Sequence, residues 1–126
     1  MTVQKFERDP AARGPVVQGF AAGGFSVEGK VYRSLLLTPE LARAWTPPPL
    51  EALTPDHLEP VLALSPAPEF IILGTGPTLA FPPRALVRAL EAKGIGVEAM
   101  DSRAAARTWG MLRGEERWIA AALMAL

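Results

Sequence analysis

The sequence contains no cysteine and only one histidine. Without thiols it can form no disulfide, thiolate metal site or thiol nucleophile, and one histidine cannot supply a histidine ligand cluster. We therefore expect neither a metal nor a cofactor. An excess of charge is also absent, because 13 Lys and Arg residues balance 13 Asp and Glu residues. The chain thus lacks the electrostatics that drive phosphate binding, and nucleic acid is not an expected partner.

Long apolar runs are missing as well. No stretch approaches the roughly 18 apolar residues of a membrane-spanning helix, and the charged first ten residues do not resemble a signal peptide. We therefore expect a cytoplasmic protein without a membrane span. Hydrophobic residues make up 49% of the 126 residues and charged residues 21%, which is typical of a folded domain. The mixture of charge, glycine and proline at the start predicts a mobile lead-in over 1–15, followed by a single domain over 16–126.

The first half of the domain carries strand patterns and a proline-rich stretch. Residues 25–28 alternate between apolar and polar side chains, and a second strand-like run covers 31–37. Gly29 and Lys30 separate the two runs, which predicts a β-hairpin. Prolines then crowd residues 39–49 and remove backbone donors, so a loop around Trp45 is expected there.

The second half alternates between helix and strand. The pattern first predicts a short helix from 54 that is bent at Pro60, and then a central strand at 70–73 that is buried on both faces. A helix follows that is opened by Pro82 and Pro83 and stopped by Gly94, and after it a strand at 95–99. The last two predicted elements are a helix capped by Asp101 or Ser102 and a third strand within 117–124. Strand, helix and strand in succession form right-handed parallel units. The sequence therefore predicts an α/β domain.

A glycine turn, Gly74-Thr75-Gly76, lies between a predicted strand and a predicted helix, where a phosphate-binding loop would be found. The dinucleotide fingerprint is incomplete, because Leu79 occupies the position of the third glycine. The Gly-Lys-Ser/Thr ending of a P-loop is absent too. We therefore favour a tight exit from the strand over nucleotide binding as the explanation of these glycines.

Topology gives a second reason to look at this turn. Open α/β sheets bind ligands at the carboxyl ends of their strands, where Thr75 and the pair Asp101-Ser102 would border one crevice. Arg103 or Arg107 on the following helix would add a guanidinium, and the set could orient a small polar ligand or a peptide carboxylate. The alternative is that Asp101 only caps its helix and that the arginines lie on a solvated face.

The aromatic residues suggest a different kind of contact. Trp109 and Trp118 sit within apolar patterns, so packing in the core accounts for them. Trp45 lies among prolines in an expected loop, which makes it the candidate for contact with a partner.

Three segments carry a family resemblance: Gly-Ile-Gly-Val-Glu-Ala-Met-Asp at 94–101, Ala-Ala-Ala-Arg-Thr-Trp at 104–109, and Glu-Arg at 116–117. They resemble the family of the domain of unknown function 498, which includes the mitochondrial complex I assembly factor 3 and an adipogenesis-associated cytosolic protein. The resemblance covers about 16–126. The matching positions are Gly74, Thr75, Gly76, Gly94, Gly96, Glu98, Asp101, Arg107, Thr108 and Arg117. Ser102, Ala106, Trp109 and Gly110 replace the family's usual Thr, Cys, Tyr and Asn.

The resemblance implies a three-layer fold in which the β-α-β-α-β units form a central mixed sheet and the amino-terminal hairpin forms a smaller sheet. It also implies a cleft shaped by the turn at 74–76 and by Asp101, Ser102, Arg107 and Thr108, and an assembly or interaction role with a protein partner. It supplies no catalytic activity, and replacement of the family's Cys, Tyr and Asn speaks against a shared enzymatic mechanism.

The leading hypothesis is therefore a non-enzymatic binding protein of the bacterial cytoplasm that assists assembly of a respiratory complex; the richness in Ala, Arg, Gly and Pro suggests the bacterial origin. One alternative is an enzyme or ligand sensor that uses Thr75, Asp101 and Arg107 on a small molecule. A third interpretation is a self-associating structural domain that forms a homodimer.

Overall fold

The structure, a computed structural model, describes residues 14–126. The predicted mobile lead-in over 1–15 lies outside the described residues, apart from Gly14 and Pro15. Pro15 is buried, and its carbonyl accepts a hydrogen bond from Nε1 of Trp109 at 2.9 Å. Packing of the domain therefore already includes Pro15.

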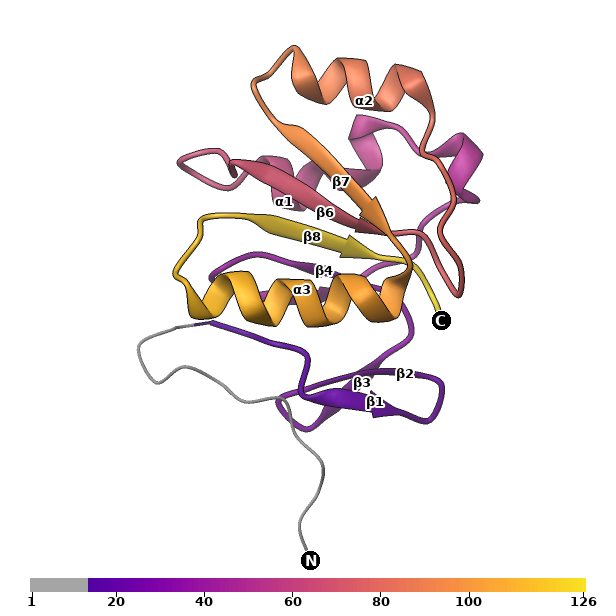
Figure 1. Cartoon of the computed structure of the whole chain (residues 1–126), viewed down its shortest axis with the longest axis vertical. Helices are drawn as coiled ribbons and strands as arrows, with labels where there is room; N and C mark the ends of the chain where they lie inside the picture. The colour runs from indigo at the N-terminus through magenta and orange to yellow at the C-terminus, as the bar shows by residue number, and fades with distance from the viewer. Residues whose placement is uncertain (1–13) are drawn as a thin grey trace, which may run out of the picture.

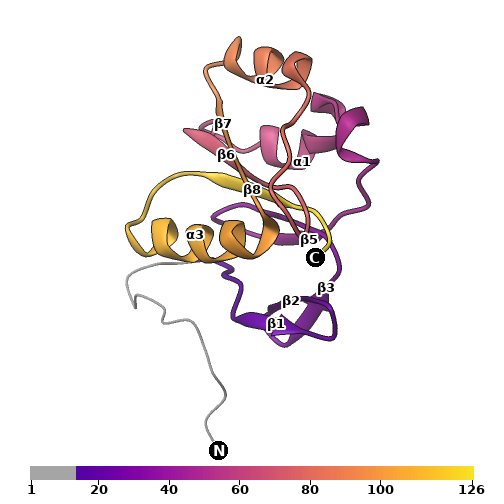
Figure 2. The same cartoon turned by 45° about the vertical axis from the view of Figure 1, so that its right-hand side comes forward.

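The larger of two sheets contains five strands in the order β5-β4-β8-β6-β7 (Figures 1 and 2). Strand β6 is parallel to β7 and β8, whereas β4 is antiparallel to β8 and β5. The mixed sheet and its parallel β-α-β-α-β units are thus confirmed. The prediction that the 70–73 strand is central needs a correction, because β8 occupies the middle and β6 lies beside it. The bounds are β4 Leu35–Leu37, β5 Ala42–Ala44, β6 Phe70–Gly74, β7 Gly96–Met100 and β8 Ala120–Leu123.

The smaller sheet contains β1 (Gly19–Ala21), β2 (Gly24–Val27) and β3 (Lys30–Tyr32), all antiparallel. The predicted hairpin is formed by β2 and β3. Its turn residues Glu28 and Gly29 have φ values of 50° and 80°, the positive pair that matches the twist of a two-residue hairpin.

The run at 31–37, predicted as one strand, is divided between the two sheets. Residues up to Tyr32 pair with β2, and β4 begins at Leu35 in the larger sheet. All of Leu35–Leu37 is buried, because Leu35 and Leu37 pack into the core on one face of that sheet and Leu36 into the core on the other. Three consecutive leucines thus indicate a strand covered on both faces.

Helices complete the three layers (Figures 1 and 2). Helix α3 and the small sheet cover one face of the larger sheet, while α1 and α2 cover the other, and each face has its own apolar core. Helix α1 is a single turn with Pro60 at its start, which agrees with the short helix predicted there. The bounds are η1 Leu50–Ala52, η2 Pro55–Leu58, α1 Glu59–Leu62, α2 Arg84–Glu91 and α3 Ser102–Gly114.

The loop predicted over 39–49 contains a strand that the pattern did not show. Strand β5 is only three residues long and pairs with β4 alone, at the edge of the sheet. Such an edge strand needs hydrogen bonds on one side only, so the nearby prolines do not prevent it. Residues 45–49 after it have no helix or strand assignment.

Candidate functional site

The turn after β6 and the start of α3 meet at the carboxyl ends of β6 and β7, as topology predicts. The Thr75 amide donates to the carbonyl of Met100 at 2.9 Å, and the Ser102 amide donates to the carbonyl of Gly76 at 2.8 Å. In return, Oγ of Ser102 accepts a hydrogen bond from the Gly76 amide at 2.9 Å. The two segments are therefore joined directly to each other by backbone and side-chain hydrogen bonds.

This junction leaves little room between its two segments. A Cβ at Gly74 would lie 2.7 Å from Oγ of Ser102 and 3.0 Å from Cδ2 of Leu123, so only glycine permits the close approach. Ser102 and Gly74 are both buried. The point that sequence reasoning identified as a crevice is thus tightly packed beside Gly74.

The polar side chains of the predicted site either bond to nearby backbone atoms or lie further along α3. The Thr75 hydroxyl donates to the carbonyl of Thr78 at 2.8 Å and accepts from the Ala80 amide at 3.0 Å. Asp101 caps α3, because its Oδ1 accepts from the Ala104 amide at 2.9 Å. Arg107 is exposed and lies about 9 Å along the helix from Asp101, from the rise per residue.

Of the predicted site residues, the structure therefore brings Gly74, Thr75, Gly76, Asp101 and Ser102 together, and it places Arg107 and the half-buried Thr108 further along α3. Asp101 and Arg107 are six residues apart, a spacing that does not place two side chains next to each other on one face of a helix.

A hollow of about 530 Å³ opens at the same end of the sheet, beside Met124 and Ala125, which directly follow β8. Trp45 forms part of its wall, and Nε1 of this residue donates to the carbonyl of His57 at 3.0 Å. The sequence prediction singled out Trp45, but the hollow itself required the tertiary structure. The full lining is Arg33, Ser34, Trp45, Thr46, Pro47, Pro48, Pro49, Leu50, Met124 and Ala125.

A second hollow, of about 470 Å³, lies along α2 and was missed by the sequence reasoning. Phe81 and Pro82 contribute from the segment before the helix, and Arg84, Val87, Arg88 and Glu91 contribute from the helix itself. A signal existed in the sequence, since Leu79 and Phe81 are large apolar residues within a stretch bounded by prolines.

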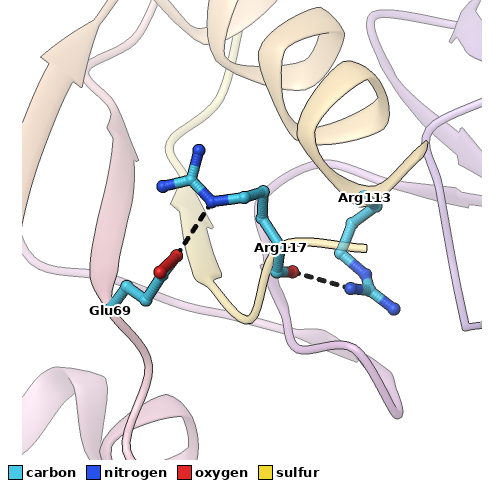
Figure 3. A network of polar contacts seen from close by, with 3 residues as sticks. All are labelled: Glu69, Arg113 and Arg117. Atoms are coloured by element: carbon cyan, nitrogen blue, oxygen red, sulfur yellow. Dashed lines mark hydrogen bonds and ion pairs between the residues drawn. The ribbon is translucent and has the colours of Figure 1, made fainter. Parts of the chain in front are cut away.

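Arg117, one of the family-matching positions, lies away from both hollows, next to the start of β6 (Figure 3). Its Nε contacts Oε2 of Glu69 at 3.0 Å, in a half-exposed ion pair. The buried Arg113 donates from Nη1 to the carbonyl of Arg117 at 2.7 Å. Burial lowers the pKa of Arg113, and the charge of Glu116 partly opposes this shift. This network secures the turn between α3 and β8.

Within residues 14–126, no group of three or more His, Cys, Asp or Glu side chains is placed to hold a metal ion. None of the helices in this range has the length and apolar character needed to cross a membrane.

Comparison with known proteins places this architecture in a family. Residues 17–124 match the family model described as protein of unknown function (DUF498/DUF598). An uncharacterized protein of Rhodobacter capsulatus is 33% identical over 119 residues, which cover 93% of this chain and 90% of that protein. The NADH dehydrogenase [ubiquinone] 1 alpha subcomplex assembly factor 3 of Xenopus tropicalis is 28% identical over 124 residues, covering 98% of this chain and 67% of the relative.

A solved structure agrees in fold as well as in sequence. The solution structure of a Bordetella pertussis protein, described as a Mth938-like domain, has a TM-score of 0.75 and 28% identity, over 95% of this chain and 91% of that one. The resemblance inferred from the segments at 94–101 and 104–109 is confirmed by these matches. The chain belongs to the DUF498/DUF598 family of proteins of unknown function.

Proposed function

We propose that this protein is a non-catalytic binding protein of the assembly type, which holds a protein partner in the hollow at Trp45 and assists assembly of a respiratory complex. The observation that carries the proposal is the contrast between two neighbouring places. The strand-end junction is closed by its own hydrogen bonds, whereas the hollow beside it is open and has walls of Trp, Pro, Leu and Met.

The walls of this hollow suit the binding of an apolar side chain. The indole of Trp45 is fixed by its hydrogen bond to the His57 carbonyl, and the three consecutive prolines have restricted backbones. A surface that is rigid before binding loses little entropy when a partner docks. Met124, although largely buried in the core, contributes a further apolar residue to the lining, and Arg33 offers a charge there.

The engaged polar groups support a non-catalytic role. A nucleophile or general base must be free to reach a substrate. The Thr75 and Ser102 hydroxyls already bond to the backbone, and the Asp101 carboxylate caps a helix. One of the relatives is an assembly factor, and this supports a protein partner over a metabolite as the ligand.

Photocrosslinking tests the proposal. A photoreactive amino acid placed at Thr46, which is exposed and lines the hollow, is expected to capture a discrete protein partner in cells that naturally contain this chain. The same group at Met111, which is exposed on α3, serves as the matched control. An adduct with a respiratory-complex subunit or assembly protein at 46 but not at 111 supports the proposal. Identical adducts at both positions, or none at 46, would contradict it.

A further inference from the structure

The segment between β6 and α2 displays two large apolar side chains to solvent. Phe81 is 86% exposed and Leu79 is 56% exposed. Both side chains belong to the same short connection and are only two residues apart, so this segment as a whole exposes apolar surface. Exposed apolar groups gathered in one place on a folded domain are typical of an interaction surface.

The segment is held in this conformation by bonds that do not involve the exposed side chains. The Thr75 hydroxyl contacts the backbone at both Thr78 and Ala80. Prolines at 77, 82 and 83 restrict the backbone on either side. The backbone that carries Leu79 and Phe81 is therefore restrained, and binding through these side chains would cost little conformational entropy.

The charges beside Phe81 indicate what would bind. Arg84 and Arg88 lie one turn apart on α2, are exposed, and line the same hollow as Phe81. Neither guanidinium forms an ion pair with another residue within 14–126. Glu91, also in the lining, is the single acidic group there. Two guanidinium groups that have no ion-pair partner among the described residues, beside an aromatic side chain, complement a segment that combines carboxylates with apolar residues.

We propose that Leu79, Phe81, Arg84 and Arg88 form a second docking surface, which binds an acidic and apolar segment of another protein. A protein segment fits better than an anionic membrane, because the surface is hollowed beside Phe81 and carries Glu91 in its wall. One apolar side chain of the partner fills the hollow, and its carboxylates contact Arg84 and Arg88. This surface is separate from the hollow at Trp45, so it stands or falls independently of the proposed function.

A random dodecapeptide display library, selected against the full chain, tests the chemistry of the partner. We expect a consensus in which Asp or Glu lies within a few positions of a large apolar residue. A synthetic peptide of that consensus is expected to bind at least about tenfold more weakly to Phe81→Ala, as for a residue at the centre of an interface. The double variant Arg84→Gln/Arg88→Gln is expected to weaken binding to a similar extent and to reduce its salt dependence.

Matched controls separate this surface from others. Met111→Ala removes a side chain that is 60% exposed on α3 and is expected to leave peptide binding unchanged, as is Thr46→Arg in the other hollow. A consensus without acidic residues, or full binding to Phe81→Ala, would overturn the proposal. Binding of the wild-type chain but not of Phe81→Ala to phosphatidylglycerol vesicles would also overturn it, because the occupant would then be a membrane. A dimer that Phe81→Ala dissociates would overturn it as well, because the occupant would then be a second copy of the chain.

Discussion

Replacement of Trp109 by alanine is expected to lower the free energy of unfolding by about 3–5 kcal/mol. The indole is fully buried in the core between α3, the larger sheet and the small sheet. Its Nε1 is also the donor to the Pro15 carbonyl, 94 residues away in sequence. The variant therefore loses apolar burial and leaves a cavity. It also loses the hydrogen bond that joins Pro15 to the helix.

Equilibrium unfolding in denaturant measures this change. Trp109→Phe keeps most of the ring in place but lacks the donor, and we expect it to cost less than the alanine variant. Met111→Ala, on an exposed position of the same helix, is expected to change stability by no more than about 0.5 kcal/mol. A loss below about 1 kcal/mol in Trp109→Ala would show that this indole does not hold the layers together.

The second large effect is expected at the strand-end junction. A methyl group at Gly74 would meet Oγ of Ser102 at 2.7 Å, so Gly74→Ala is expected to destabilise the protein by about 1–3 kcal/mol through overpacking. Ser102→Ala leaves the buried Gly76 amide without its acceptor and is expected to cost about 1–3 kcal/mol.

A double-mutant cycle makes this prediction specific. Because the new methyl group at 74 occupies the space of the lost hydroxyl, the double variant Gly74→Ala/Ser102→Ala is expected to lose less stability than the two single variants together. Gly110→Ala is the matched control, since a Cβ there meets nothing within 4 Å and alanine favours the helix by about 1 kcal/mol. Strictly additive losses of stability, or a Gly74→Ala variant as stable as Gly110→Ala, would mean that residues 74 and 102 are not tightly packed against each other.

The pattern of helices and strands could be predicted largely from local signals. The continuous apolar run at 70–73 indicated a buried strand, Asp101 indicated a helix start, and the parallel order followed from strand-helix-strand succession. Strand β5 was not predicted because three residues at a sheet edge are too few to show the alternation of apolar and polar side chains that marks a strand. The division of 31–37 was also not predicted, because the bend at Arg33 and Ser34 contains no glycine or proline to mark it.

The candidate site was predictable only in part. Topology correctly brings Thr75 and Ser102 together, since both follow neighbouring parallel strands. Whether a hydroxyl faces a ligand or its own backbone depends on how closely Gly74 approaches Ser102, and sequence spacing does not contain that distance. The hollow at Trp45 joins segments about 80 residues apart, from 45 to 124, so no local motif describes it.

The most direct test of the central claim is native mass spectrometry of the chain gently isolated from its own cells, alongside Thr46→Arg and Asp101→Asn variants. We expect the wild type and Asp101→Asn to carry a protein-sized mass increment, and Thr46→Arg to lose it because the long side chain fills the hollow. A small-molecule increment that disappears in Asp101→Asn and persists in Thr46→Arg would contradict a partner-binding role and identify the strand ends as a ligand site.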